Sequence, residues 1–233
     1  TKEMHPDDKF LDTAEIFHLW VIEADFEDEF PLKKAGFNVV WTDNVKPYKK
    51  IKVRILNGAH TSLVAGALLS GIETVGEAMN DDVASAFLNK CMKEEILPTI
   101  GENEESIAFA NSVFDRFKNP FIQHKWRSIA LNSVSKFSVR VLPTLLEYKE
   151  KNGVYPKGLT LALANLIYFY KNDNPDDAES VVATMKNDSI AEILSNILLW
   201  QSDLSDMNDI IEEYYNKIDT IGAKETMKWI LSE

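Results

Sequence analysis

The stretch that most constrains the fold is residues 55–72, which run for 18 positions without a charged side chain. A segment of this length is close to what a membrane-spanning helix needs. Polar residues such as Asn57, His60 and Ser70 interrupt it, and neither an aromatic belt nor a flanking polybasic loop accompanies it. We therefore expect a central helix that is buried on nearly every side, and we expect no membrane partner.

Helical spacing dominates from residue 48 onward. A helix capped by Asp81 or Asp82 is expected to end at Pro98, and another helix is expected to start near Pro143 and to close at Gly153. Apolar periodicity predicts further helices over residues 105–117, 159–170, 176–186 and 189–200, followed by two short ones. The chain is therefore predicted to be mainly α.

The first fifty residues differ from the rest in their pattern of residue types. Residues 16–22 and 36–42 are β-branched and aromatic runs, which are typical of short strands or extended segments. Pro47 then marks a break before the next element. We expect a division into residues 1–47, with a short extended or β segment, and a helical domain over residues 48–233.

Composition narrows the classes of partner. The 25 basic and 37 acidic residues give a formal charge of −12, whereas nucleic-acid-binding domains cluster Lys and Arg on one face, so no nucleic acid partner is expected. The single cysteine, Cys91, cannot form an internal disulfide, and no basic-plus-apolar leader opens the sequence, so a cytoplasmic location is expected. Cys91, His18 and His124 lack the spacing of metal or nucleophile chemistry, so structural roles and no metal site are expected.

Three polar residues within residues 52–60 carry the most chemical information. On a regular α-helix, at about 100° per residue, His60 would lie about 80° and Asn57 about 140° from Lys52, so all three share one side. Apolar neighbours point in the direction of Lys52, so its stem is expected to lie on an apolar surface while its ammonium reaches toward the other two. Arg54, about 200° around the helix, is expected to face away and to serve the structure.

These residue types suit one kind of chemistry. A lysine in a partly desolvated site has a lowered pKa, because burial penalises the charged form, and can act as a general base near neutral pH. Asparagine can donate to a carbonyl or alkoxide oxygen, and histidine can donate or accept at the same oxygen, so the trio could interconvert an alcohol and a carbonyl. The alternative is a lysine that stretches to solvent beside two core polar groups bonded to neighbouring backbone.

Three blocks of sequence stand in a distinctive order: Trp-Val-Ile-Glu at 20–23 followed by Phe26, Asp-Asn-Val-Lys-Pro-Tyr at 43–48, and Lys-Val-Arg-Ile-Leu-Asn-Gly-Ala-His at 52–60. In this order they resemble the long-chain mannitol dehydrogenase family of NAD-dependent polyol and uronate reductases, and the likeness extends through residues 115–120 and 135–143. The resemblance implies a carboxy-terminal helical domain similar to that of 6-phosphogluconate dehydrogenase-like proteins. It also implies Lys52 as general acid and base, with Asn57 and His60 as stabilisers of the substrate oxygen.

The sequence looks most like the branch of this family that interconverts D-altronate and D-tagaturonate. A sugar acid carries a carboxylate that a cation must fix, and Lys136 and Arg140 follow the family's later substrate-facing segment, so they are candidate substrate-binding residues. Their alternative is a solvated or ion-paired surface charge. Lys49 stands where polyol-oxidising relatives carry an acidic residue, which puts a proton relay through a carboxylate at this position in doubt. Residues 132–136 also depart from the family's DGSxR/K segment.

The resemblance further implies NAD, bound mainly by an amino-terminal nucleotide-binding domain with a glycine-rich turn. No glycine-rich loop occurs here, so we expect residues 1–47 to be the end of that domain and its junction, the domain itself to be a partner outside this chain, and the chain alone to be inactive. Two hypotheses stay open: a mannonate/fructuronate or neutral polyol dehydrogenase of the same family, and a non-catalytic helical interaction module whose acidic carboxy-terminal helices meet a partner.

Overall fold

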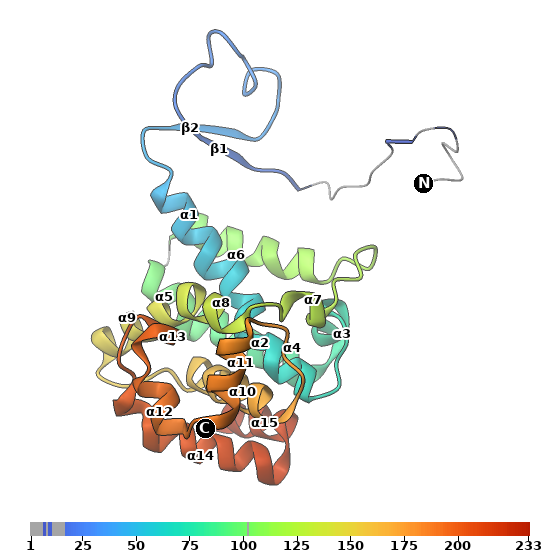
Figure 1. Ribbon diagram of the computed structural model, residues 1–233. Helices are drawn as coiled ribbons and strands as arrows, with labels where there is room; N and C mark the ends of the chain where they lie inside the picture. The colour runs from blue at the N-terminus through green and yellow to red at the C-terminus, as the bar shows by residue number, and fades with distance from the viewer. Residues whose placement is uncertain (1–6, 8, 11–16, 102) are drawn as a thin grey trace. The chain divides into compact units, whose positions relative to one another are not determined.

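The computed structural model describes residues 7, 9–10, 17–101 and 103–233, which fall into two units, Thr1–Lys49 and Lys50–Glu233 (Figure 1). In the first unit, β1 (Trp20–Glu23) and β2 (Val39–Thr42) form a two-stranded parallel sheet, with Trp20 opposite Val39. The two predicted extended runs are confirmed at these positions, while residue 16 lies outside the described residues.

The connection between the two strands is organised by one carboxylate. Glu27 accepts a 2.6 Å hydrogen bond from Trp41 Nε1 on β2 and two more from the backbone N–H groups of Lys33 and Lys34. Parallel strands need a long crossover, and here a single side chain fixes its turns to the second strand.

The rest of the chain is helical. Its first half contains α1 (Lys46–Lys52), the π-helix η1 (Val53–Asn57), α2 (Gly58–Leu69), α3 (Val75–Asn80), α4 (Asp82–Lys90), the π-helix η2 (Cys91–Ile96), α5 (Leu97–Ile100), α6 (Glu104–Phe117) and α7 (Trp126–Ile129). Its second half contains α8 (Ser133–Arg140), α9 (Leu142–Asn152), α10 (Lys157–Asn172), α11 (Glu179–Asn187), α12 (Ile190–Ser195), α13 (Ile197–Trp200), the 3₁₀ helix η3 (Ser205–Met207), α14 (Asn208–Ile221) and α15 (Ala223–Ser232). The predicted mainly helical class with a short β segment near the amino terminus is confirmed.

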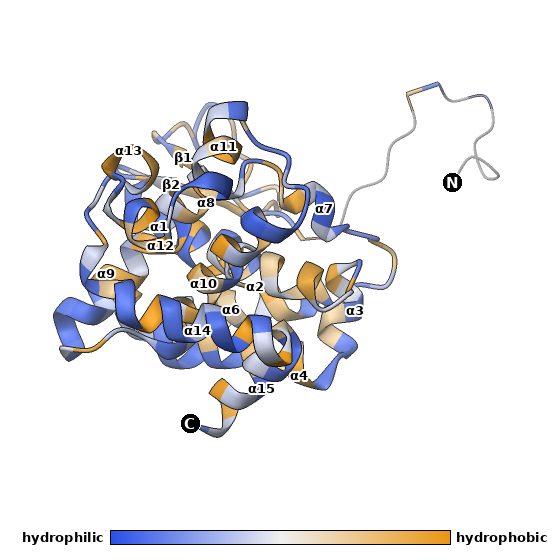
Figure 2. Ribbon diagram, turned by 60° about the horizontal axis from the view of Figure 1, so that its bottom comes forward, coloured by the Kyte–Doolittle hydropathy of each residue, from blue (hydrophilic) through white to orange (hydrophobic). Residues whose placement is uncertain are grey.

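Helices α2 and α10 lie at the centre of the helical unit, surrounded by helices with hydrophilic outer faces (Figure 2). Small residues let the two helices approach closely, since a Cβ on Gly66 of α2 would lie 3.0 Å from Asn165 Nδ2 of α10. Most of α2 is buried, as the uncharged run predicted. Within the described residues, no helix has the length and apolar character that a bilayer crossing requires.

Several predicted helix ends are confirmed and others are wrong. Helix α9 carries Pro143 in its first turn and closes at Gly153, whose φ is 76°. Pro98 does not end a helix: it lies in the first turn of α5, which follows η2 directly. The helix expected over 176–186 begins only at Glu179, and the one expected over 189–200 breaks at Asn196, whose side chain caps α13.

Candidate functional site

The helix that carries Lys52, Asn57 and His60 is not a regular α-helix. Gly58 N–H donates to the carbonyl of Val53, five residues earlier, which makes η1 a π-turn between α1 and α2. A π-turn holds one residue more than an α-turn, so later residues are rotated back by roughly one step, about 100°. The angles of about 140° and 80° predicted for Asn57 and His60 on a regular helix therefore do not hold for this segment.

The π-turn is anchored to α9 by Arg54. This buried guanidinium donates from Nη1 to Thr144 Oγ1 at 2.7 Å and from Nη2 to Glu147 Oε1 at 2.8 Å. The predicted structural role of Arg54 is therefore confirmed. Since the anchor begins two residues after Lys52 and three before Asn57, it fixes the backbone on which both stand.

Lys52 is exposed, whereas Asn57 and His60 are half-buried. That the stem of Lys52 lies on an apolar surface stays a prediction.

His60 is held by aromatic rings. Its imidazole stacks on Phe117, at the end of α6, with ring centres 4.2 Å apart and an interplanar angle of 24°. His124 and Trp126 meet it edge-on, at 5.3 and 6.1 Å between ring centres. Nε2 of His60 is buried and has no hydrogen-bond partner among the described residues. The ring is thus oriented by packing, with hydrogen-bonding capacity left over.

The charge state of His60 follows from this setting. Burial lowers its pKa to about 3, and the neighbouring charges of His124, Arg140 and Arg116 act in the same direction. The imidazole is therefore neutral near pH 7, with one ring nitrogen as a donor and the other as an acceptor.

Lys136 and Arg140 both lie on α8 and are half-buried, and burial lowers the pKa of each. Lys136 Nζ donates to the carbonyl of Ile129 at 2.9 Å. The end of α8 meets the start of α2, because a Cβ on Gly58 would lie 3.4 Å from the carbonyl oxygen of Arg140. The structure therefore brings Arg140 within electrostatic range of His60, and Lys136 within range of Arg140.

Sequence reasoning missed the proximity of His124 to His60. We predicted a structural role for His124, yet its exposed ring lies edge-on to His60. The available signal was its place directly after residues 115–120, a block that the family resemblance covers. Cys91 is fully buried, which raises the pKa of its thiol, and His18 accepts a hydrogen bond from Asn38 N–H, so both have structural contacts. Across the described residues, no cluster of three or more His, Cys, Asp or Glu side chains could hold a metal ion.

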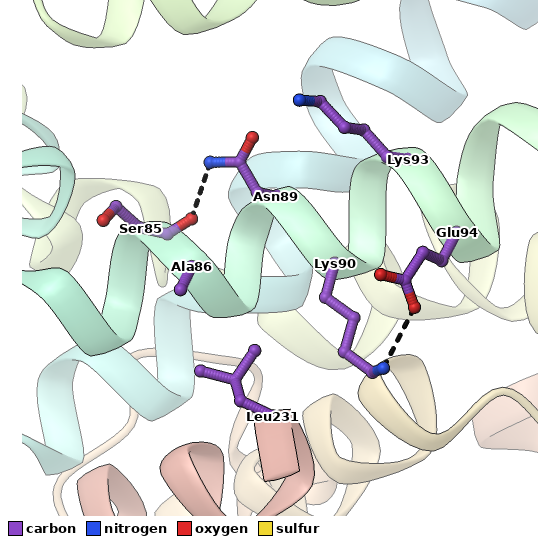
Figure 3. A pocket seen from close by; sticks show the side chains of 7 residues that line it. All are labelled: Ser85, Ala86, Asn89, Lys90, Lys93, Glu94 and Leu231. Atoms are coloured by element: carbon purple, nitrogen blue, oxygen red, sulfur yellow. Dashed lines mark hydrogen bonds and ion pairs between the residues drawn. The ribbon is translucent and has the colours of Figure 1, made fainter. Parts of the chain in front are cut away.

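A separate open hollow of about 440 Å³ lies where η2, α4 and the end of α15 meet (Figure 3). Its lining is Ser85, Ala86, Asn89, Lys90, Lys93, Glu94 and Leu231. Lys90 already pairs with Glu94 at 3.0 Å, and Asn89 donates to the carbonyl of Ser85. The hollow includes none of the predicted site residues, so the candidate site is the surface around Lys52, Asn57 and His60.

Residues 44–222 match the model of the mannitol dehydrogenase C-terminal domain, and the chain therefore belongs to the mannitol dehydrogenase family. It is 39% identical over 247 residues to the altronate oxidoreductase of Pectobacterium atrosepticum (94% of this chain, 51% of the relative) and 41% identical over 241 residues to that of Yersinia enterocolitica (94% and 50%). The chain thus spans about half the length of the curated relatives it matches.

Two solved structures share the fold at 22% identity and a TM-score of 0.77. One is the mannitol 2-dehydrogenase of Pseudomonas fluorescens in a ternary complex with NAD and D-mannitol, for which the match covers 85% of this chain and 44% of that chain. The other is a D-sorbitol dehydrogenase in substrate-free form, with 91% and 46% covered.

Proposed function

We propose that the chain supplies the substrate-binding half of an NAD-dependent oxidoreductase that interconverts D-altronate and D-tagaturonate. The observation that carries the proposal is the π-turn at Val53–Asn57, because one additional residue in the turn would bring Lys52, Asn57 and His60 closer to one side of the helix. The names of the altronate oxidoreductase relatives support this substrate, and the NAD bound to the Pseudomonas fluorescens enzyme supports this cofactor.

In this proposal, residues 1–47 are the end of a cofactor domain and residues 48–233 form the substrate domain. The parallel pairing of β1 and β2 supports the first part, because parallel strands are characteristic of nucleotide-binding sheets. The described residues include no glycine-rich turn between a strand and a helix, so they do not supply a cradle for the pyrophosphate of NAD. NAD would be held mainly by a nucleotide-binding domain of the kind that the other half of the relatives could provide, and residues 1–233 alone would be inactive.

The described residues divide the proposed reaction among them. Lys52 Nζ takes the proton of the substrate hydroxyl in the oxidative direction and returns it in the reductive one. The amide of Asn57 donates a hydrogen bond to the same oxygen, and neutral His60 donates another, so negative charge that develops there is stabilised. Lys136 and Arg140 bind the carboxylate of the sugar acid. The chemistry that NAD would supply, when bound, is acceptance of the hydride of the alcohol carbon.

The test compares two proteins: residues 1–233, and the protein as its gene encodes it. For each, NADH binding is measured by calorimetry and D-altronate oxidation by NADH absorbance. The encoded protein is expected to bind NADH and to oxidise D-altronate, and residues 1–233 to bind NADH weakly and to show no turnover. Faster turnover of D-mannonate or D-mannitol than of D-altronate would contradict the substrate assignment. Turnover of none of these would favour the non-catalytic interaction module.

A further inference from the structure

The segment before α7 is held rigidly against the start of α3. Val75 N–H donates to the carbonyl of His124 at 2.9 Å, and Trp126 N–H donates to the carbonyl of Glu73 at 2.9 Å. Lys125 forms an antiparallel bridge with Thr74, the residue that caps α3. The backbone on both sides of His124 is therefore fixed, although its side chain is exposed.

The imidazole of His124 is free to bind a ligand. It has no side-chain hydrogen bond in the part of the chain that the structure describes, and its ring lies edge-on to His60 at 5.3 Å between centres. The mechanism assigned above does not use it. A rigidly placed, exposed imidazole beside a reacting centre is a group that a substrate can contact without any rearrangement of the fold.

Basic side chains lie within electrostatic range of His60. In the described residues, the charged groups that act on His60 are His124, Arg140 and Arg116, and each of them opposes a positive charge there. Arg140 is the cation of α8 in this range, and a cation beside a reacting centre favours an anionic ligand there. The reacting alcohol of a sugar acid lies only a few bonds from its carboxylate. With the alcohol at His60, the carboxylate would therefore lie near these basic side chains.

We propose that His124 determines specificity by binding the carboxylate end of the substrate, together with Arg140, while the reacting alcohol lies against Lys52, Asn57 and His60. The inference rests on the proposed function and names one further residue for it. His124 contributes an N–H donor to the carboxylate, and when protonated it adds a charge-assisted bond. A substrate without a carboxylate would gain nothing from this residue.

The test uses the protein as its gene encodes it and two substrates that differ only in the carboxylate, D-altronate and the alditol D-altritol. His124→Phe, which keeps a ring and removes the N–H donor, should raise KM for D-altronate about tenfold, the effect of losing one hydrogen bond to a charged group, and should leave kcat within about twofold. The KM for D-altritol should not change. If D-altritol is not turned over, its inhibition constant against D-altronate replaces KM. Gln123→Ala, an exposed polar neighbour on the same segment, is the matched control and should change neither constant.

The outcomes separate this inference from the proposed function. An unchanged KM for D-altronate in His124→Phe, with a wild-type enzyme that oxidises D-altronate, overturns the role of His124 and leaves the function standing. An equal rise in KM for both substrates, or a fall in melting temperature, would show that His124 only supports the fold. A wild-type enzyme that oxidises neither substrate would refute both.

Discussion

Replacing His60 by Asn should reduce the loss of unfolding free energy that occurs when the pH falls below 7. A histidine titrates near 6.5 in the unfolded chain, and burial lowers the pKa of His60 to about 3 in the folded one. Between these values the unfolded state binds the additional proton, so the stability that neutral His60 provides is lost as the pH falls through this window. From pH 7 to pH 4.5 this linkage amounts to about 2.5 kcal/mol of unfolding free energy.

The assay is urea unfolding at pH 7 and at pH 4.5, followed by circular dichroism at 222 nm, for wild type and His60→Asn. Other groups titrate in both proteins, so the difference between the two pH dependences isolates His60. Wild type should lose about 2.5 kcal/mol more than the variant between the two pH values. Equal losses would refute the argument, because they would mean that His60 is not held neutral by burial.

Three substitutions test the packing that supports the site, each by chemical denaturation. Glu95→Gln should cost about 1–2 kcal/mol, because the buried Glu95 carboxylate accepts the N–H groups of Gly158 and Leu159 in the first turn of α10. Burial raises the pKa of Glu95 to about 7, so wild-type stability should fall as the pH rises from 5 to 8 and the variant should lack this fall. Arg54→Ala should cost about 2–3 kcal/mol, whereas Arg127→Ala, which breaks an exposed pair, should cost less than about 1. Gly158→Ala would place a Cβ 2.7 Å from a buried cysteine sulfur and should cost about 2–3 kcal/mol, while Gly76→Ala, with nothing within 4 Å, should change stability by less than about 1.

The helices whose ends are marked by proline or glycine, or whose length is marked by an apolar run, were predictable from sequence. Pro143 and Gly153 fix the two ends of α9 by local backbone chemistry, and the apolar run over residues 159–170 could only be a core helix. Pro98 misled the prediction, because a proline reads equally as the end of one helix and as the start of the next. Only the continuation of the chain through η2 decides between the two.

The candidate site was predictable in composition but not in geometry. Lys52, Asn57 and His60 lie within nine residues, so their association is a local property of the sequence. The π-turn at Val53–Asn57 could not be predicted in this way, because residue spacing at 100° per step cannot indicate an additional residue in the turn. His124 was missed because its proximity to His60 depends on packing between segments 64 positions apart.

The role of Lys52 as the proton-transferring group is the central claim. In the protein as its gene encodes it, D-altronate oxidation with NAD is measured for wild type, Lys52→Ala and Lys93→Ala, an exposed lysine of η2 outside the site. We predict that Lys52→Ala lowers kcat by about 10²–10⁴-fold, that added methylamine restores part of this loss, and that Lys93→Ala behaves as wild type. Near-normal turnover by Lys52→Ala would contradict the account.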